Sequence, residues 1–204
     1  LFRGENPPNG AIIDYWLASS ASEVALTVHD RSGTLVQTLS PARARGVNRV
    51  VWNLRHADLP VRGGFGDDDG TPRGGNLAGP YVVPGIYTVR LVSGGRTLEQ
   101  KVDVKDDPRI DALPADRKVW ADFQVQVAGA IRQFAPVADK VQKAPAGDAQ
   151  VTDLKRQSRE LLSRLTRLYG ETGRWVGRPT VDQLGEFKFY QQAVERLTAA
   201  AGGI

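Results

Sequence analysis

The chain has 204 residues, of which 41% are hydrophobic and 25% are charged, and its formal net charge is +4. A typical domain has about 150 residues, so this length predicts one large domain or two small ones with ordinary hydrophobic cores. These values exclude a wholly disordered chain. Apolar stretches are all shorter than the roughly 18 residues of a bilayer-spanning helix, so we expect no membrane insertion.

Cysteine is absent, and only His29 and His56 could supply imidazole ligands. This excludes a disulfide scaffold, thiolate metal sites and structural zinc. The start, Leu1–Asn6, has no basic region followed by an apolar one, so an intact signal peptide is not predicted. Since the chain starts with leucine and contains no methionine, we expect a mature product or a piece of a longer protein.

The composition changes near residue 113. Residues 1–113 consist of short apolar alternations punctuated by Gly, Pro, Asn and Asp, and carry 13 basic and 13 acidic side chains. Residues 114–204 are long runs rich in Ala, Leu, Gln, Arg and Glu, with 14 basic and 10 acidic side chains. We therefore predict two domains, and the net positive charge belongs to the second.

Period-two alternation predicts six or seven strands in the first half, which is typical of a two-sheet β-sandwich. Turns are expected at Asp30–Gly33, at Pro84-Gly85 as the centre of a type II turn, and at Gly94-Gly95. The last strand has a polar face and is predicted to be an outer strand. The main predicted strands are Ala11–Leu17, Val24–His29, Leu35–Leu39, Val47–Arg55, a strand with Tyr87, Val89 and Leu91, and Leu98–Val104.

Residues 56–83 interrupt this pattern with a glycine-rich segment that shows no periodicity and contains Asp67, Asp68 and Asp69. So long a connection without structure of its own is expected to be either mobile or functional. The three carboxylates are candidate calcium ligands, although solvated loop charge is the simpler interpretation. They do not match the Asp-x-Asp-x-Asp-Gly pattern, because Phe65 occupies its first position.

The second half predicts three amphipathic helices. The first has a stripe from Val119 to Phe134 and a kink expected at Pro136. The second ends at Gly170 and Gly173, and Thr180 with Gln183 forms the capping-box pattern that begins the third. Apolar stripes are too weak to stabilise isolated helices, so the three should pack together or against the sandwich. The stripes of the second and third helices are Leu154, Leu161, Leu162, Leu165 and Leu168, and Leu184, Phe187, Tyr190, Val194 and Leu197.

Catalytic and nucleic-acid interpretations find little support in the residue pattern. The chain has no Gly-x-Ser-x-Gly elbow, and neither histidine lies near a candidate nucleophile, so we predict no catalytic residues. Glu160 interrupts the basic row of the second helix, so intrahelical ion pairs rather than nucleic acid are expected there. That row consists of Lys155, Arg156, Arg159, Arg164 and Arg167.

Aromatic residues offer a third kind of site, because sugars stack on exposed rings. Trp52 and Tyr87 alternate with aliphatic residues and are predicted to lie in a core, while Trp120 and Trp175 are expected to cover helix contacts. Phe65 and Tyr81, in or beside the long segment, are the candidates for ligand contact.

Four motifs in order resemble the C-terminal region of bacterial secreted proteins with sortilin-like or neuraminidase-repeat (BNR) β-propellers, many labelled glycosyl hydrolases. The strand motifs are also similar to the immunoglobulin-like domain of flagellar hook capping proteins. The usual family pattern has Asp after the tryptophan, where this chain has Asn53. The motifs are Pro7–Tyr15, Gly46–Arg55, Pro84–Leu91 and Asp107–Ile110.

This resemblance implies an α+β chain: an immunoglobulin-like β-sandwich over 1–113, followed by an all-α three-helix element over 114–204. It also implies a non-catalytic accessory module, secreted or periplasmic, that follows the β-propeller of the same parent chain and serves assembly, spacing or partner docking. Another envelope protein or a glycan is a further expected partner. The alternative is a ligand- or carbohydrate-binding lobe, assisted by calcium, whose 56–83 segment completes a glycosidase-type site with the propeller.

Overall fold

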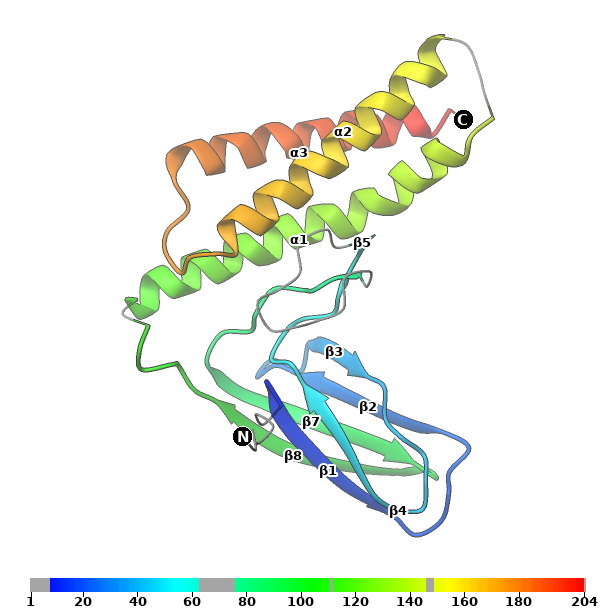
Figure 1. Cartoon of the computed structure of the whole chain (residues 1–204), viewed down its shortest axis with the longest axis vertical. Coiled ribbons are helices and arrows are strands. Elements are labelled where there is room, and N and C mark those ends of the chain that lie inside the picture. Colours follow the sequence, from blue (N-terminus) through cyan, green and yellow to red (C-terminus); the bar gives the residue numbers. More distant parts are fainter. Residues whose placement is uncertain (1–7, 63–75, 111, 146–148, 204) are drawn as a thin grey trace, which may run out of the picture. The chain divides into compact units, whose positions relative to one another are not determined.

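The computed structural model describes residues 8–62, 76–110, 112–145 and 149–203, and it is a mixed α+β structure with antiparallel sheets and three helices (Figure 1). Its described residues divide into two compact units. The first contains residues 8–57 and 81–110, and the second contains 58–62, 76–80, 112–145 and 149–203. Residues 58–62 and 76–80 thus belong to the second unit, although residues of the first unit precede and follow them in the chain.

Two antiparallel sheets form the described part of the first unit. All the main predicted strands are present, but the one predicted to reach Arg55 ends at Trp52 because Leu54 adopts a left-handed φ of 58° and turns the backbone out of the strand. The smaller sheet pairs β1 (Ala11–Leu17) with β4 (Gly46–Trp52). The larger has the order β3 (Leu35–Leu39), β2 (Val24–His29), β7 (Gly85–Ser93), β8 (Arg96–Val104).

The core of the first unit takes side chains from both sheets. Trp52 is completely buried, its ring centroid lies 5.3 Å from that of Tyr87 in an edge-on arrangement, and its indole Nε1 donates to the Arg55 carbonyl at 3.0 Å. Both rings were predicted as core residues, and both predictions are confirmed. The other buried members of this core are Tyr15, Leu17, Val24, Leu26, Val28, Val36, Leu39, Val82 and Val89.

Two predicted turns have the expected backbone, and one differs. Asp30 closes the β2–β3 turn, where its Oδ1 accepts from the Ser32 and Thr34 amides. Gly94 and Gly95 both have positive φ, 54° and 75°, as a two-residue hairpin requires. Gly85, however, has φ +156° and is already the first paired residue of β7, so it is not in the conformation expected at the third position of a type II turn, near +80°.

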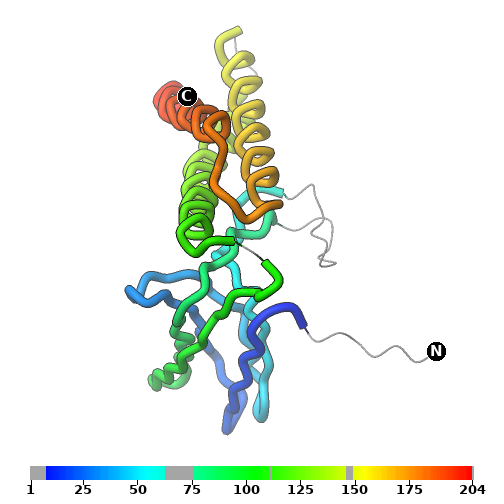
Figure 2. The backbone as a smooth tube through the Cα atoms, turned by 90° about the vertical axis from the view of Figure 1, so that its left-hand side faces the viewer, coloured from blue at the N-terminus to red at the C-terminus, as the bar shows by residue number. Residues whose placement is uncertain are grey.

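Three helices form most of the second unit: α1 (Pro114–Lys143), α2 (Ala149–Thr172) and α3 (Val181–Ala201). They lie side by side around one core (Figures 1 and 2). The prediction of three packed helices is confirmed, and α1 continues without a break through Pro136. Val119 and Leu184, which were placed on the buried stripes, are exposed, and Gly170 lies inside α2 rather than at its end. None of the helices in the described part of the chain is long and apolar enough to cross a membrane.

A short antiparallel hairpin from the 56–83 segment belongs to the second unit. It pairs β5 (Leu59–Arg62) with β6 (Asn76–Leu77). Leu59 is 0% exposed within the helical core, and the Tyr169 hydroxyl on α2 donates to the Ala78 carbonyl at 2.9 Å. The described ends of this segment are therefore structural, which sequence periodicity could not indicate because each strand has only two to four residues.

A buried polar group joins α1 to the C-terminal end of α2. The Trp120 indole Nε1 donates to the Thr172 carbonyl at 2.7 Å, and the Gln124 side-chain amide donates to the Thr172 hydroxyl. The bond from Trp120 satisfies a carbonyl that the end of α2 leaves without an intrahelical partner. Trp120 thus covers a helix contact as predicted, whereas the prediction for Trp175 is wrong, since 82% of that side chain is exposed.

The predicted capping box of α3 is confirmed. The Thr180 hydroxyl accepts from the Gln183 amide at 3.2 Å, and Gln183 Oε1 accepts from the Thr180 amide at 3.0 Å. We expect Thr180→Ala to lower the free energy of unfolding of the second unit by about 1 kcal/mol, because the Gln183 backbone amide loses its acceptor at the start of the helix. Urea denaturation followed by helical circular dichroism measures this change. Thr180→Ser retains the hydroxyl and should unfold like the parent chain; equal losses in both variants would contradict the role of the cap.

Candidate functional site

Most of the residues predicted as ligand or metal candidates lie outside the described part of the chain: Phe65, Asp67, Asp68 and Asp69. Within the described part, no group of three or more His, Asp or Glu side chains is arranged to hold a metal ion. The calcium and loop-site interpretations therefore stay predictions.

Tyr81, the other candidate for ligand contact, is described and exposed at the border of the first unit. Its backbone forms an isolated antiparallel bridge with Arg55, and the Arg55 guanidinium carbon lies 3.5 Å from the centroid of its ring. A cation in this position is attracted to the negative face of the ring. One face of the ring is thus already covered by a side chain of the same unit, and a sugar could stack only on the other.

His29 lies at the end of β2 in a local hydrogen-bonded arrangement. Its Nε2 is 2.9 Å from the Thr27 hydroxyl and its Nδ1 is 3.1 Å from the Gly33 carbonyl oxygen. One ring nitrogen thus contacts a residue of the same strand and the other contacts the turn that closes the hairpin, so this histidine supports the strand end.

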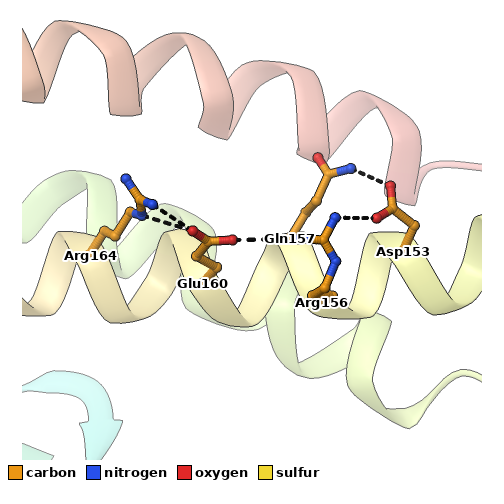
Figure 3. Close-up of polar contacts among 5 residues, drawn as sticks. All are labelled: Asp153, Arg156, Gln157, Glu160 and Arg164. Atoms are coloured by element: carbon orange, nitrogen blue, oxygen red, sulfur yellow. Dashed lines mark hydrogen bonds and ion pairs between the residues drawn. The ribbon is translucent and has the colours of Figure 1, made fainter.

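In the basic row of α2, Arg156 and Arg164 form ion pairs with acidic residues of the same helix (Figure 3). Glu160 Oε1 lies 2.6 Å from Arg164 Nη2, and Arg156 Nη2 lies 2.5 Å from Asp153 Oδ1. Arg159 donates to Gln142 Oε1 at 3.0 Å, and Lys155 donates to the Ala144 carbonyl at 2.6 Å. The predicted intrahelical ion pairs are thus present, and Arg159 and Lys155 have further partners at the C-terminal end of α1.

Three of the four recognised motifs contain residues with a clear local structural role. Gly10, with φ +134°, leaves space for the Trp52 carbonyl oxygen, which would lie 2.2 Å from an added Cβ. Asn53 Oδ1 accepts from the Arg55 amide at 3.2 Å, a bond that an aspartate would also make. The Asp-Pro-Arg turn is held by Arg109, whose Nη2 lies 2.6 Å from Asp107 Oδ2 and whose amide donates to Asp107 Oδ1 at 2.9 Å.

Hydrogen bonds from Arg109 hold the pKa of Asp107 at about 2, below its ordinary value of 3.8. Because the pKa is lower in the folded chain, the stabilisation by this pair is present above pH 4 and is lost as the pH falls from about 4 towards 2. NMR titration of the Asp107 carboxyl should give this low pKa. Arg109→Ala should return it towards 3.8, while Arg31→Ala, in another exposed turn, should not change it. A pKa near 3.8 in the parent chain would contradict this assignment.

One exposed surface combines apolar and charged side chains: the outward face of the β1–β4 pair, called here the ribbon face. Cross-strand register places Ile12 opposite Val51, Asp14 opposite Arg49, and Trp16 opposite Val47. Trp16 is 66% exposed and Val47 is 77% exposed. The ribbon face consists of Ile12, Asp14, Trp16, Val47, Arg49 and Val51.

An ion pair crosses the middle of the ribbon face. Arg49 binds Asp14 with two parallel hydrogen bonds of 2.8 Å, from Nε to Oδ1 and from Nη2 to Oδ2. These bonds hold the pKa of Asp14 below its ordinary value. An exposed apolar patch that contains a tryptophan and an arginine is typical of a protein-binding surface. The ribbon face therefore has the composition of a surface that binds another protein.

The ribbon face was not among the sites predicted from the sequence. The signal for it is that β1 is apolar on both of its faces: Ile13, Tyr15 and Leu17 alternate with Ile12 and Trp16. A strand with one face in water would carry polar residues there.

No family model, curated protein or solved structure matches this chain.

Proposed function

We propose that this chain is a non-catalytic accessory module from the C-terminal part of a larger secreted or periplasmic β-propeller protein, and that its ribbon face docks onto the preceding domain of that parent. The first unit would be an immunoglobulin-like sandwich. Two antiparallel sheets around a common core with Trp52 support this fold, together with the ordered motifs described above.

The observation that carries the docking function is the exposure of Trp16 beside Val47. Leaving a tryptophan and a valine together in water on a paired strand is unfavourable, and burying them in a complex would recover roughly 25 cal/mol per Å² of apolar area. Trp16 lies on β1, the first of the described strands, so a domain that precedes this unit would be linked closest to that strand. The bidentate Arg49–Asp14 pair would remain as a polar contact within the interface.

The docking proposal is tested by binding between the purified chain and the separately produced preceding domain of its parent, using isothermal titration calorimetry. Trp16→Ala should weaken binding at least about tenfold, as loss of a central aromatic anchor does. Trp175→Ala is the matched control, because this tryptophan is exposed in the other unit and should have no effect. Equal effects of the two substitutions, or no binding by the parent chain, would reject the proposal.

The proposal that the chain has no catalytic activity is tested separately with aryl-glycoside, ester and peptide substrates. We expect rates equal to those in buffer alone. A faster rate that falls in His56→Ala or Asp68→Asn would instead support the enzymatic alternative. The carbohydrate-binding alternative predicts a rise in thermal stability with calcium or oligosaccharides, since a ligand that binds only the folded state stabilises it.

A further inference from the structure

The free edge of β8 leads to an inference that is independent of the proposed function. β8 is the last strand of the four-stranded sheet, and among the described strands only β7 pairs with it. It has nine residues, and its pairing with β7 runs from Ser93↔Arg96 to Gly85↔Val104 without a bulge. Such an edge presents a row of backbone donors and acceptors to a further strand.

The hairpin determines which residues of β8 offer their backbone groups at this edge. In a two-residue turn the flanking residues, here Ser93 and Arg96, form a hydrogen-bonded pair. Because hydrogen-bonded and non-hydrogen-bonded positions alternate in antiparallel strands, the even-numbered residues of β8 bond to β7. The odd-numbered residues therefore direct their N–H and C=O groups to the free edge: Thr97, Glu99, Lys101 and Asp103.

We propose that β8 pairs antiparallel with β8 of a second copy of this chain, around a two-fold axis at Gln100. This register places Glu99 opposite Lys101 of the other copy, and Lys101 opposite its Glu99. Both are odd-numbered pairs, so the backbone groups that face the edge can form the hydrogen bonds. The two four-stranded sheets would then continue into one of eight strands, through an isologous contact of the kind most homodimers use.

Charge complementarity selects this register over its neighbours. Odd-numbered residues lie opposite odd-numbered residues only when the two-fold axis passes through a residue. The neighbouring registers therefore have the axis at residue 99 or at residue 101. An axis at residue 99 would place Glu99 opposite itself, whereas an axis at residue 101 would place Lys101 opposite itself and Glu99 opposite Asp103. Like charges directly opposite each other destabilise a strand pair, and opposite charges stabilise it. The axis at residue 100 alone uses all nine residues and pairs these charges favourably.

Side chains on the face of β8 that carries Leu98 also support pairing with a second copy of the chain. Leu98 is 65% exposed although it lies on the side of the sheet that carries the core residues Tyr87 and Val89. In the proposed register it lies opposite Val102 of the second copy, which packs partly against the core of its own unit. Pairing would thus cover an apolar side chain that a single copy leaves in water.

The oligomeric state of the full chain, measured over a concentration series by sedimentation velocity, tests this inference. The parent chain should dimerise with rising concentration. Lys101→Glu alone and Glu99→Lys alone should each weaken dimerisation about tenfold or more, because both opposite-charge pairs become like-charge pairs. An equimolar mixture of the two variants should restore a dimer, since two carboxylates of one chain then face two lysines of the other.

Controls separate edge pairing from changes in folding or net charge. Lys188→Glu makes the same charge change on an exposed site of α3 and should leave dimerisation unaltered. Gln100→Cys should form an intermolecular disulfide on oxidation, because the chain has no cysteine of its own and paired Cα atoms at such a position are about 4.5 Å apart. Leu98→Cys, about 13 Å from its symmetry mate, should not.

Three results would overturn the inference. The first is a parent chain that stays monomeric at every concentration. The second is a loss of dimer that is equal in Lys101→Glu and Lys188→Glu, or that mixing the two charge variants does not reverse. The third is disulfide formation by Leu98→Cys as efficient as by Gln100→Cys. None of these results bears on docking by the ribbon face, which lies on the other sheet.

Discussion

Trp52→Ala is expected to lower the free energy of unfolding of the first unit by about 3–5 kcal/mol, as truncation of a buried aromatic side chain does. The indole is completely buried, packs edge-on against Tyr87, and donates to the Arg55 carbonyl. Its removal leaves a cavity between residues of both sheets and takes the donor from that carbonyl. Urea denaturation of the full chain, followed by NMR signals of β2 and β7, measures the loss for this unit.

Trp16→Ala provides the matched control for this prediction. Trp16 lies on β1, the strand paired with the one that carries Trp52, but most of its side chain is in water. Truncating it should change the free energy of unfolding by less than about 0.5 kcal/mol. Equal losses in the two variants would mean that the core of the first unit does not depend on the Trp52 side chain.

Leu59→Ala is expected to destabilise the second unit by about 2–5 kcal/mol, the range observed for truncation of buried leucines. Leu59 precedes the helices in the chain by more than fifty residues, yet it is fully buried among helical side chains. The loss should appear as a lower urea midpoint of helical circular dichroism. Leu184→Ala, on the exposed side of α3, should have little effect.

The outcome for Leu59 decides between two interpretations of the 56–83 segment. If the helical transition is unchanged in Leu59→Ala, the hairpin of β5 and β6 is dispensable and the segment is free for another role. A lower midpoint means that the ends of the segment are committed to the helical core. Any ligand-binding role would then belong to the residues between them.

Elements governed by neighbouring residues were predicted well. The β2–β3 turn depends on Asp30 and Gly33, and the start of α3 depends on Thr180 and Gln183, so each involves residues within four positions of one another. The burial of Trp52 and Tyr87 followed from alternation along single strands. Such interactions are local, and the residue types that satisfy them can be recognised without knowing the rest of the fold.

The candidate sites were predicted less well. Residue type alone selected Tyr81, whose ring is stacked with Arg55, and three aspartates that lie outside the described residues. The surface that the structure offers instead, around Trp16 and Val47, has no chemical motif. This surface can be recognised only from the pairing of β1 with β4, which places these apolar side chains together on the outward face.

By itself, the sequence determined the strand and helix periods, the turns at Asp30–Gly33 and Gly94-Gly95, the capping box, the edge position of the last strand, and the change from a strand-rich to a helical part. Only the tertiary structure decided that Leu59 belongs to the helical core and that Trp16 faces outward beside Val47. The physical reason is that these placements depend on which distant segments bury apolar area against one another. That free energy is the sum of many small contacts, so it cannot be inferred from the type of any single residue.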